Sequence, residues 1–418
     1  MDGALDPHFF RHEWARLLAV LVRVFGVHNL ALAEDVAQQT LWRAMEVWKQ
    51  SGVPENPSAW LSTVAKRAAI DELRRERAHA RAAPELARYL ESEWTRVPTV
   101  DELFSPQPLH DDELRVMFSL AQPRLPEASQ VALVLQLSCG FSVEEVAAAF
   151  LDTPVAMRKR LQRARRAIDG SRSLYVLTES DLPARLASVQ RAVYLLFNEG
   201  YHGACPETAV REDLCREALR LAGLLAAHPA TRAPSSIALA ALLHLHAARL
   251  PARRDADGAL LPWSEQRREL WDRALVARGL ALLDESSTGD ELSTFHVEAA
   301  IAACHATAAT PEDTPWDRIV GLYDTLARLA PSPVVALSRA IAVAHRDGPE
   351  RGLRELRALP AAELEGYVFY QAALGETSAR AGKRREAREH WEAALRLARS
   401  PMEREFFERR IGETARFV

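Results

Sequence analysis

Apolar residues recur every three or four positions along most of this chain, and this spacing constrains the fold more than any other feature. The stretch from Phe9 to Phe25 is an example, with apolar side chains at 10, 14, 17, 18, 21, 24 and 25. This is the period of an amphipathic α-helix. β-Branched runs are short, and glycine and proline fall mostly between the helical segments. We therefore predict an all-α fold without strands.

The composition is that of a globular protein. It does not indicate a function, which therefore has to be inferred from local sequence patterns. Apolar residues make up 48% and charged residues 26% of 418 positions, which is enough for two or three domains. The formal net charge is only −4, so nucleic-acid binding would have to come from local basic faces. No signal peptide, long apolar run or Cys-x-x-Cys pair occurs, so we expect a cytoplasmic protein without a membrane span, zinc site or disulfide framework.

A basic amphipathic helix is predicted over residues 57–81. Pro57 suits a first helical turn, and Ser58 can cap it. Trp60, Leu61 and Val64 belong to its apolar stripe. The opposite face carries six basic side chains, namely Lys66, Arg67, Arg74, Arg75, Arg77 and Arg81. A solvated charged face would explain these charges as well as a binding surface would.

A helix-turn-helix is predicted within residues 113–170. Ser142 followed by Glu145 is a capping box that opens one helix, and Pro154 suits the first position of the next. This second helix has no acidic residue from 155 to 168. Its basic residues are Arg158, Lys159, Arg160, Arg163, Arg165 and Arg166. A capped helix, a short turn and a basic second helix form the arrangement that binds the major groove of DNA.

These segments, taken in order, resemble the sigma-70 family of RNA polymerase initiation factors, in its compact extracytoplasmic-function group. The resemblance is carried by AEDVAQQTLWRAMEVW at 33–48, by the 57–76 segment, and by LPEASQVALVLQLSCGFSVEEVA at 125–147 with the basic helix after it. It implies a polymerase-binding and −10 recognition and melting domain at 1–81 and a −35 recognition domain at 113–170. Opened DNA needs cations for its phosphates and a rigid apolar platform, which the 57–81 helix offers.

The resemblance also assigns candidate contact residues. It places polymerase contacts at Glu34, Asp35, Gln38 and Gln39, although acids near a helix start also suit the helix dipole. It places −10 contacts at Trp60, Lys66, Arg67, Asp71, Arg74 and Arg75. It places −35 contacts at Val155, Arg158, Lys159, Arg160, Arg163 and Arg165, the last two as grips on the DNA backbone or as solvated charges. On the polymerase-binding helix, the spacing turns Val36, Leu41, Ala44, Met45 and Trp48 toward a core.

An acidic linker is predicted at 82–112. Residues 82–113 carry eight acidic side chains and two basic ones, and the helical pattern fades there. Such a segment can be a solvated spacer between domains. The sigma-factor resemblance implies an alternative, in which the acidic strand threads through the polymerase cleft and mimics nucleic acid.

The remaining residues, 171–418, resemble the tetratricopeptide-like extension of one sigma subgroup. WEAALRLARSP begins at Trp391 and YDTLARLAPSP begins at Tyr323, 68 positions apart and twice a repeat of about 34 residues. We expect such repeats from about residue 300. Stacked helix pairs expose a concave surface, so the expected role is to modulate activity through a small protein partner or anti-sigma-type regulator.

No catalytic constellation is apparent, so we expect no enzyme, no catalytic residue, no metal and no cofactor. The chain has no phosphate-binding glycine loop and no His-Glu-x-x-His motif. Four tryptophans of the tail, at 263, 271, 316 and 391, are expected in the core. The predicted function is promoter-specific initiation with core RNA polymerase. The alternative is a helix-turn-helix transcription regulator that acts without polymerase docking and whose tail is a protein-interaction scaffold.

Overall fold

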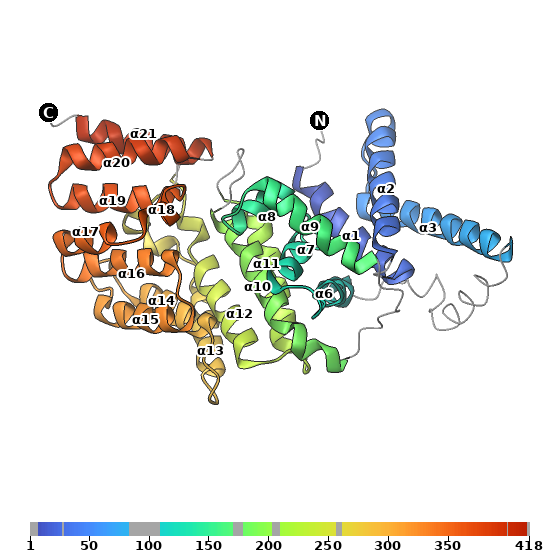
Figure 1. Cartoon of the computed structure of the whole chain (residues 1–418), viewed down its shortest axis with the longest axis horizontal. Coiled ribbons are helices and arrows are strands. Elements are labelled where there is room, and N and C mark those ends of the chain that lie inside the picture. Colours follow the sequence, from blue (N-terminus) through green and yellow to red (C-terminus); the bar gives the residue numbers. More distant parts are fainter. Residues whose placement is uncertain are drawn as a thin grey trace. The chain divides into compact units, whose positions relative to one another are not determined.

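A computed structural model describes residues 7–26, 29–82, 109–169, 179–202, 210–255, 261–398 and 400–415. These residues form helices and contain no β-strand, which confirms the predicted all-α fold (Figure 1). The chain divides into two compact units, residues 1–196 and 197–418. Residues 83–108, which hold most of the predicted acidic linker, lie outside the described residues.

The first unit holds seven of the labelled α-helices and the start of an eighth among its described residues. They are α1 (Pro7–Phe25), α2 (Leu30–Ser51), α3 (Pro57–Ala82), α6 (Leu109–Leu120), α7 (Glu127–Leu137), α8 (Val143–Ala149), α9 (Pro154–Asp169) and α10 (Leu182–His202), which crosses the boundary between the units. The 3-10 helix η2 (Glu179–Asp181) precedes α10.

Helices α1, α2 and α3 pack on one another through their apolar stripes. Gly26 ends α1 with a left-handed backbone (φ +80°), which glycine adopts without a steric penalty. Leu18, Leu30 and Leu61, one from each helix, are almost fully buried. The α3 ribbon extends beyond the other two helices (Figure 1). The three helices therefore form a small core that positions the outer faces of α2 and α3.

Helices α7, α8 and α9 form the predicted helix-turn-helix, in which α7 packs on α8 and α9. The predicted capping box is confirmed, because Ser142 Oγ accepts from the Glu145 amide while the Glu145 carboxylate accepts from the Ser142 amide. Pro154 begins α9 as predicted. Helix α6 joins this module to the first three helices by packing on both α1 and α7. Glu145 also forms an ion pair with Arg11 of α1 at 3.0 Å.

In the second unit, the described elements of secondary structure are again helices. They are α11 (Glu212–Ala227), α12 (Pro234–Ala247), α13 (Arg273–Ser286), α14 (Thr294–Thr307), α15 (Trp316–Leu329), α16 (Pro333–Arg346), α17 (Pro349–Arg357), α18 (Ala361–Leu364), α19 (Val368–Arg380), α20 (Arg384–Leu397) and α21 (Pro401–Ala415). Three 3-10 turns lie between α12 and α13, namely η3 (Leu250–Ala252), η4 (Trp263–Glu265) and η5 (Arg268–Leu270).

From α14 onward, each long helix packs on its neighbours in sequence, and Figure 1 shows them as a stack. Close approaches between helices depend on small residues. A Cβ atom at Gly375 of α19 would lie 2.6 Å from the Trp391 ring of α20, and one at Gly352 of α17 would lie 2.1 Å from the Ala344 Cβ of α16. The buried side chains of α19, α20 and α21 form a further cluster around Trp391. The unit is thus held together by contacts between neighbours along the chain.

Candidate nucleic-acid and polymerase interface

The four candidate polymerase contacts lie on the outer side of α2. Asp35, Gln38 and Gln39 are exposed, whereas Glu34 is part-buried. The opposite side of the helix is buried, at Leu30, Ala33, Val36, Ala37, Thr40, Ala44 and Trp48. The helix therefore presents a polar stripe on a firmly held scaffold.

Two large apolar side chains extend this stripe. Trp42 is 62% exposed and Met45 is 51% exposed. The expectation that Met45 faces a core is wrong, because it lies seven positions after Gln38, on the outer face of the same helix, while Ala44 and Trp48 fill the core. Trp42 was not among the predicted contact residues, although it is exposed beside them. Its spacing of seven from Asp35 and four from Gln38 was the available signal.

The six candidate −10 contacts occupy α3 with different degrees of exposure. Arg67, Asp71, Arg74 and Arg75 are exposed, and Lys66 is part-buried. Asp71 pairs with Arg74 at 3.8 Å, and Arg75 pairs with Glu72 at 3.0 Å. Each of these pairs is at the surface, where such contacts are weak and easily exchanged for a phosphate.

Trp60 belongs instead to an aromatic cluster at the base of α3. Its ring lies 5.3 Å from the Trp48 ring in an edge-to-face arrangement. The rings of Phe9 and Phe10 of α1 also lie 6.1 Å from the Trp48 ring. Trp60 is part-buried, so one side of its ring packs in the cluster while the remainder is reached by solvent.

The candidate −35 contacts lie along α9. Val155, near its start, is 60% exposed, and Arg158, Lys159 and Arg163 are exposed. Arg158 forms a surface pair with Glu144 of α8 at 3.3 Å. Arg160 pairs with Asp152 in the turn at 3.2 Å and lies over the Phe150 ring. The start of α9 therefore presents the exposed basic side chains of Arg158 and Lys159 next to the exposed apolar Val155.

Arg165, another member of this set, forms hydrogen bonds to side chains of two other helices, α2 and α7. Its guanidinium donates to Glu34 Oε2 at 2.8 Å and to Gln136 Oε1 at 3.1 Å. Arg165 and Glu34 are both part-buried, with 33% of the Arg165 side chain and 17% of the Glu34 side chain exposed. One predicted polymerase contact and one predicted DNA contact are thus paired with each other.

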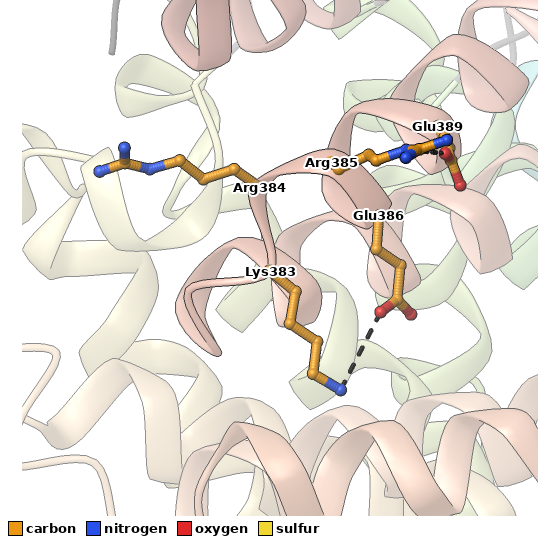
Figure 2. A pocket seen from close by; sticks show the side chains of 5 residues that line it. All are labelled: Lys383, Arg384, Arg385, Glu386 and Glu389. Atoms are coloured by element: carbon orange, nitrogen blue, oxygen red, sulfur yellow. Dashed lines mark hydrogen bonds and ion pairs between the residues drawn. The ribbon is translucent and has the colours of Figure 1, made fainter. Parts of the chain in front are cut away.

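Other surfaces in the described parts of the chain offer less. No group of three or more metal-ligating side chains is found there, and none of the described helices is long and apolar enough to cross a membrane. A surface pocket at the start of α20 is lined by Lys383, Arg384, Arg385, Glu386 and Glu389 (Figure 2). Two of its cations are paired within the lining, Lys383 with Glu386 and Arg385 with Glu389. This pocket carries no distinctive chemistry.

Comparison with known proteins bears first on α1, α2 and α3. Sigma-70 region 2 matches residues 9–79, which span the three-helix core with both of its outer faces. This part of the chain is similar to region 2 of the sigma-70 family. Sigma-70 proteins are transcription factors rather than enzymes, and they bind core RNA polymerase and promoter DNA.

The chain has a second family match and a relative that is similar over most of its length. A family of unknown function (DUF6596) matches residues 185–287. Uncharacterized protein R00370 of Rhizobium meliloti (strain 1021) is 36% identical over 400 residues, which cover 95% of this chain and 93% of that protein. The similarity to this relative therefore includes the long C-terminal unit. No solved structure matches the chain.

Proposed function

We propose that the chain is a promoter-specific sigma factor of the extracytoplasmic-function group. In this proposal α2 docks on core RNA polymerase, α3 takes the −10 element and α9 reads the −35 element, with domains at 1–81 and 113–170. Because core polymerase acts in the cytoplasm, the proposed location of the protein is the cytoplasm. The observation that carries the proposal is the sigma-70 region 2 match over α1–α3, together with the exposed stripe that includes Asp35, Gln38 and Trp42 on α2.

The shape and charge of α9 support its proposed role. The helix follows the capped α8 after a short turn, as in major-groove readers. Its exposed side carries Arg158, Lys159 and Arg163. A helix-turn-helix regulator without polymerase docking remains the alternative. Such a regulator does not need a segment like sigma-70 region 2. The match of residues 9–79 to this region therefore favours the sigma factor.

The Arg165–Glu34 pair adds a condition to this function. If Glu34 contacts polymerase and Arg165 contacts DNA, their mutual ion pair at 2.8 Å must open first. The structure then corresponds to a closed arrangement of the two DNA-binding modules, and promoter engagement requires the two to part. The proposed linker at 82–112 supplies the chain length for this movement.

The C-terminal unit is proposed to be a tetratricopeptide-like stack that modulates initiation. Sequential packing from α14 to α21 supports this assignment. So does the fit of Gly375 against Trp391, a small residue and a large one that meet between the helices of one pair. The proposed partner of the stack is a small protein or an anti-sigma-type regulator.

The decisive experiment is run-off transcription with purified core polymerase on the DNA upstream of the protein's own gene. Initiation at a defined start site that depends on this protein is expected. Binding to that DNA without any dependence of transcription on core docking would favour the alternative regulator. A truncated chain for testing the tail must keep α10, because Arg185 is almost fully buried and donates to the Phe118 carbonyl of α6 at 2.9 Å.

A further inference from the structure

The second unit contains a group of arginine and aromatic side chains that the proposed function does not use. This arginine–aromatic cluster consists of Tyr201 at the end of α10, Arg249 and Arg253 on either side of η3, Trp263 in η4, Arg268 in η5 and Trp271 after it. All six lie in the region that matches the family of unknown function. Tyr201, Arg253, Arg268 and Trp271 are each at least nine-tenths buried.

The three guanidinium groups are stacked on the aromatic rings. Arg249 lies 5.4 Å and Arg268 lies 4.8 Å from the centre of the Trp271 ring, so both flank the same indole. Arg268 also lies over Trp263 at 5.2 Å, and Arg253 lies over Tyr201 at 4.0 Å. Cations over ring faces are favourable contacts, but they leave the in-plane N–H donors of a guanidinium free for other partners.

No acidic side chain among the described residues forms an ion pair with these arginines. Arg249 donates to the Gln266 amide oxygen. Arg253 lies 3.4 Å from His202 Nδ1, and Arg268 donates to the backbone carbonyls of His305 and Ala308. Glu312 and Asp313 act on Arg268 electrostatically but form no ion pair with it among the described contacts. The cluster therefore gathers positive charge without an ion-paired acid, which is unfavourable in a buried position.

A comparison within the same unit shows how unusual this is. Arg211 is buried as deeply as these residues, yet it pairs with Glu199 at 3.6 Å. Buried arginines are normally matched in this way.

The cluster also holds several buried polar atoms without a hydrogen-bond partner. They are Arg253 Nε, Arg268 Nη2 and the Nε1 atoms of Trp263 and Trp271. These nitrogen atoms are donors only. Unpaired buried donors are uncommon in native proteins. A molecule that satisfies them must supply acceptor atoms.

The local electrostatic field favours negative charge. Burial would raise the pKa of the Tyr201 phenol, but Arg249 and Arg253 lower it on balance. Burial, with Arg249 and Arg253, lowers the pKa of the adjacent His246 to about 3. Solvent reaches part of Arg249, Trp263 and His246, which are only part-buried. Two members of the cluster, Arg249 and Trp263, are thus reached by solvent, while the other four are buried.

We propose that the arginine–aromatic cluster is a binding site for a small organic anion whose carboxylate or phosphate oxygens accept from the unpaired donors and whose body packs against the indole rings. The ligand supplies the missing countercharge, so binding stabilises the second unit. This inference goes beyond the sigma-factor function and does not depend on it. A tail that binds a metabolite-sized anion would have a means of sensing a chemical signal.

The test uses the full chain in chloride buffer at constant ionic strength. Inorganic phosphate, phenyl phosphate and benzoate are titrated while the midpoint of thermal unfolding and the tryptophan fluorescence are followed. We expect a saturable rise in the midpoint with phenyl phosphate or benzoate that is larger than with inorganic phosphate, because the ring adds contact with the indoles. A response to the phosphates alone would identify a phosphoryl ligand, and a response to benzoate alone a carboxyl ligand. No rise with any of the three beyond that of sodium chloride would overturn the proposal.

Variants separate binding from a structural role. Arg249→Gln should weaken anion affinity at least about tenfold and leave the unfolding midpoint in chloride unchanged or higher, because it removes a part-buried charge that no acidic side chain pairs with. Arg253→Gln tests the same point if the first variant does not fold. Arg254→Gln is the matched control, because Arg254 is exposed and pairs with Glu212 at 3.4 Å outside the cluster. Wild-type anion affinity in both cluster variants would reject the site.

Discussion

Arg165 of α9 and Glu34 of α2 are paired at 2.8 Å although 131 positions separate them in the sequence. The pair is part-exposed, so we expect a coupling of about 0.5–1 kcal/mol. Single variants Glu34→Gln and Arg165→Gln and the double variant form a thermodynamic cycle in urea unfolding. Arg166→Gln is the control, because Arg166 is exposed on the same turn. A coupling indistinguishable from zero would contradict an interaction that holds α9 to α2.

Polymerase docking can be tested on the exposed stripe of α2. Asp35→Arg and Trp42→Ala should each weaken binding to core polymerase, the tryptophan by about 1–2 kcal/mol if it inserts into a pocket of the partner. Both side chains are exposed, so helix content and unfolding free energy should stay within about 0.5 kcal/mol of wild type. The measurement is binding of labelled chain to core enzyme by fluorescence anisotropy.

The control for the docking variants is Gln50→Ala, an exposed position in the last turn of the same helix. It should bind core enzyme like the wild type. If Asp35→Arg and Trp42→Ala also bind like the wild type, α2 is not the docking helix.

DNA recognition can be divided between two parts of α9. Arg158→Ala and Lys159→Ala should each reduce affinity for the upstream element by ~1–3 kcal/mol and relax its sequence preference, as expected for lost base contacts. Arg163→Ala should weaken all sequences alike and reduce the salt slope by about one unit. Mobility-shift titrations at several salt concentrations distinguish the two patterns. Unchanged preference and affinity in Arg158→Ala would mean that another surface reads the DNA.

Two glycines of the tail should respond oppositely to the same substitution. Gly375→Ala places a Cβ 2.6 Å from the Trp391 ring and should lower the unfolding free energy by about 1–3 kcal/mol. Gly321→Ala, inside α15 with no atom within 4 Å, should raise it by about 0.5–1 kcal/mol. Urea or thermal unfolding measures both. Equal effects of the two substitutions would show that α19 and α20 do not pack as described.

The tail should also lose stability as the pH falls. Burial, with nearby Arg249, His246 and Arg268, lowers the pKa of His305 to about 3. An unfolded histidine titrates near pH ~6.5, so below that pH the unfolded state binds a proton that the folded state does not. The free energy of unfolding then falls with decreasing pH, by up to about 1.4 kcal/mol per pH unit for this residue, until pH ~3.

The variant His305→Phe isolates this effect. Its ring can occupy the same place between Trp263 and Trp316, but it cannot titrate. Thermal unfolding of the wild type and the variant at pH 7.5, 6.5 and 5.5 should give a shallower pH dependence for the variant. Parallel curves would mean that other groups account for the acid sensitivity.

Local signals explain what the sequence predicted well. The capping box of Ser142 and Glu145 and the start of α9 at Pro154 each depend on residues within one helical turn. Burial of Trp271 and Trp391 also agrees with prediction. The misplacement of Met45 had a different cause, since helical spacing alone does not show which apolar residues of α2 the neighbouring helices cover.

The features that escaped prediction are contacts between distant segments. The Arg165–Glu34 pair and the arginine–aromatic cluster unite residues from separate helices and turns. In the cluster, Arg249, Arg253 and Arg268 come from two short turns, and no period links them to Tyr201. Each of these arginines looks like an ordinary surface charge in the sequence. Only the packing of the turns shows that they are brought together without acids.

The carboxylate of Glu145 serves two partners, the start of its own helix α8 and Arg11 of α1. The two contacts have different roles. The first lies within the helix-turn-helix, whereas the second joins that module to the α1–α3 core. In the proposed movement of the two modules, the contact with Arg11 has to open, whereas the capping contact lies within the moving module. In this proposal the helix-turn-helix moves as one unit, and the N-terminus of α8 stays capped by Ser142 and Glu145.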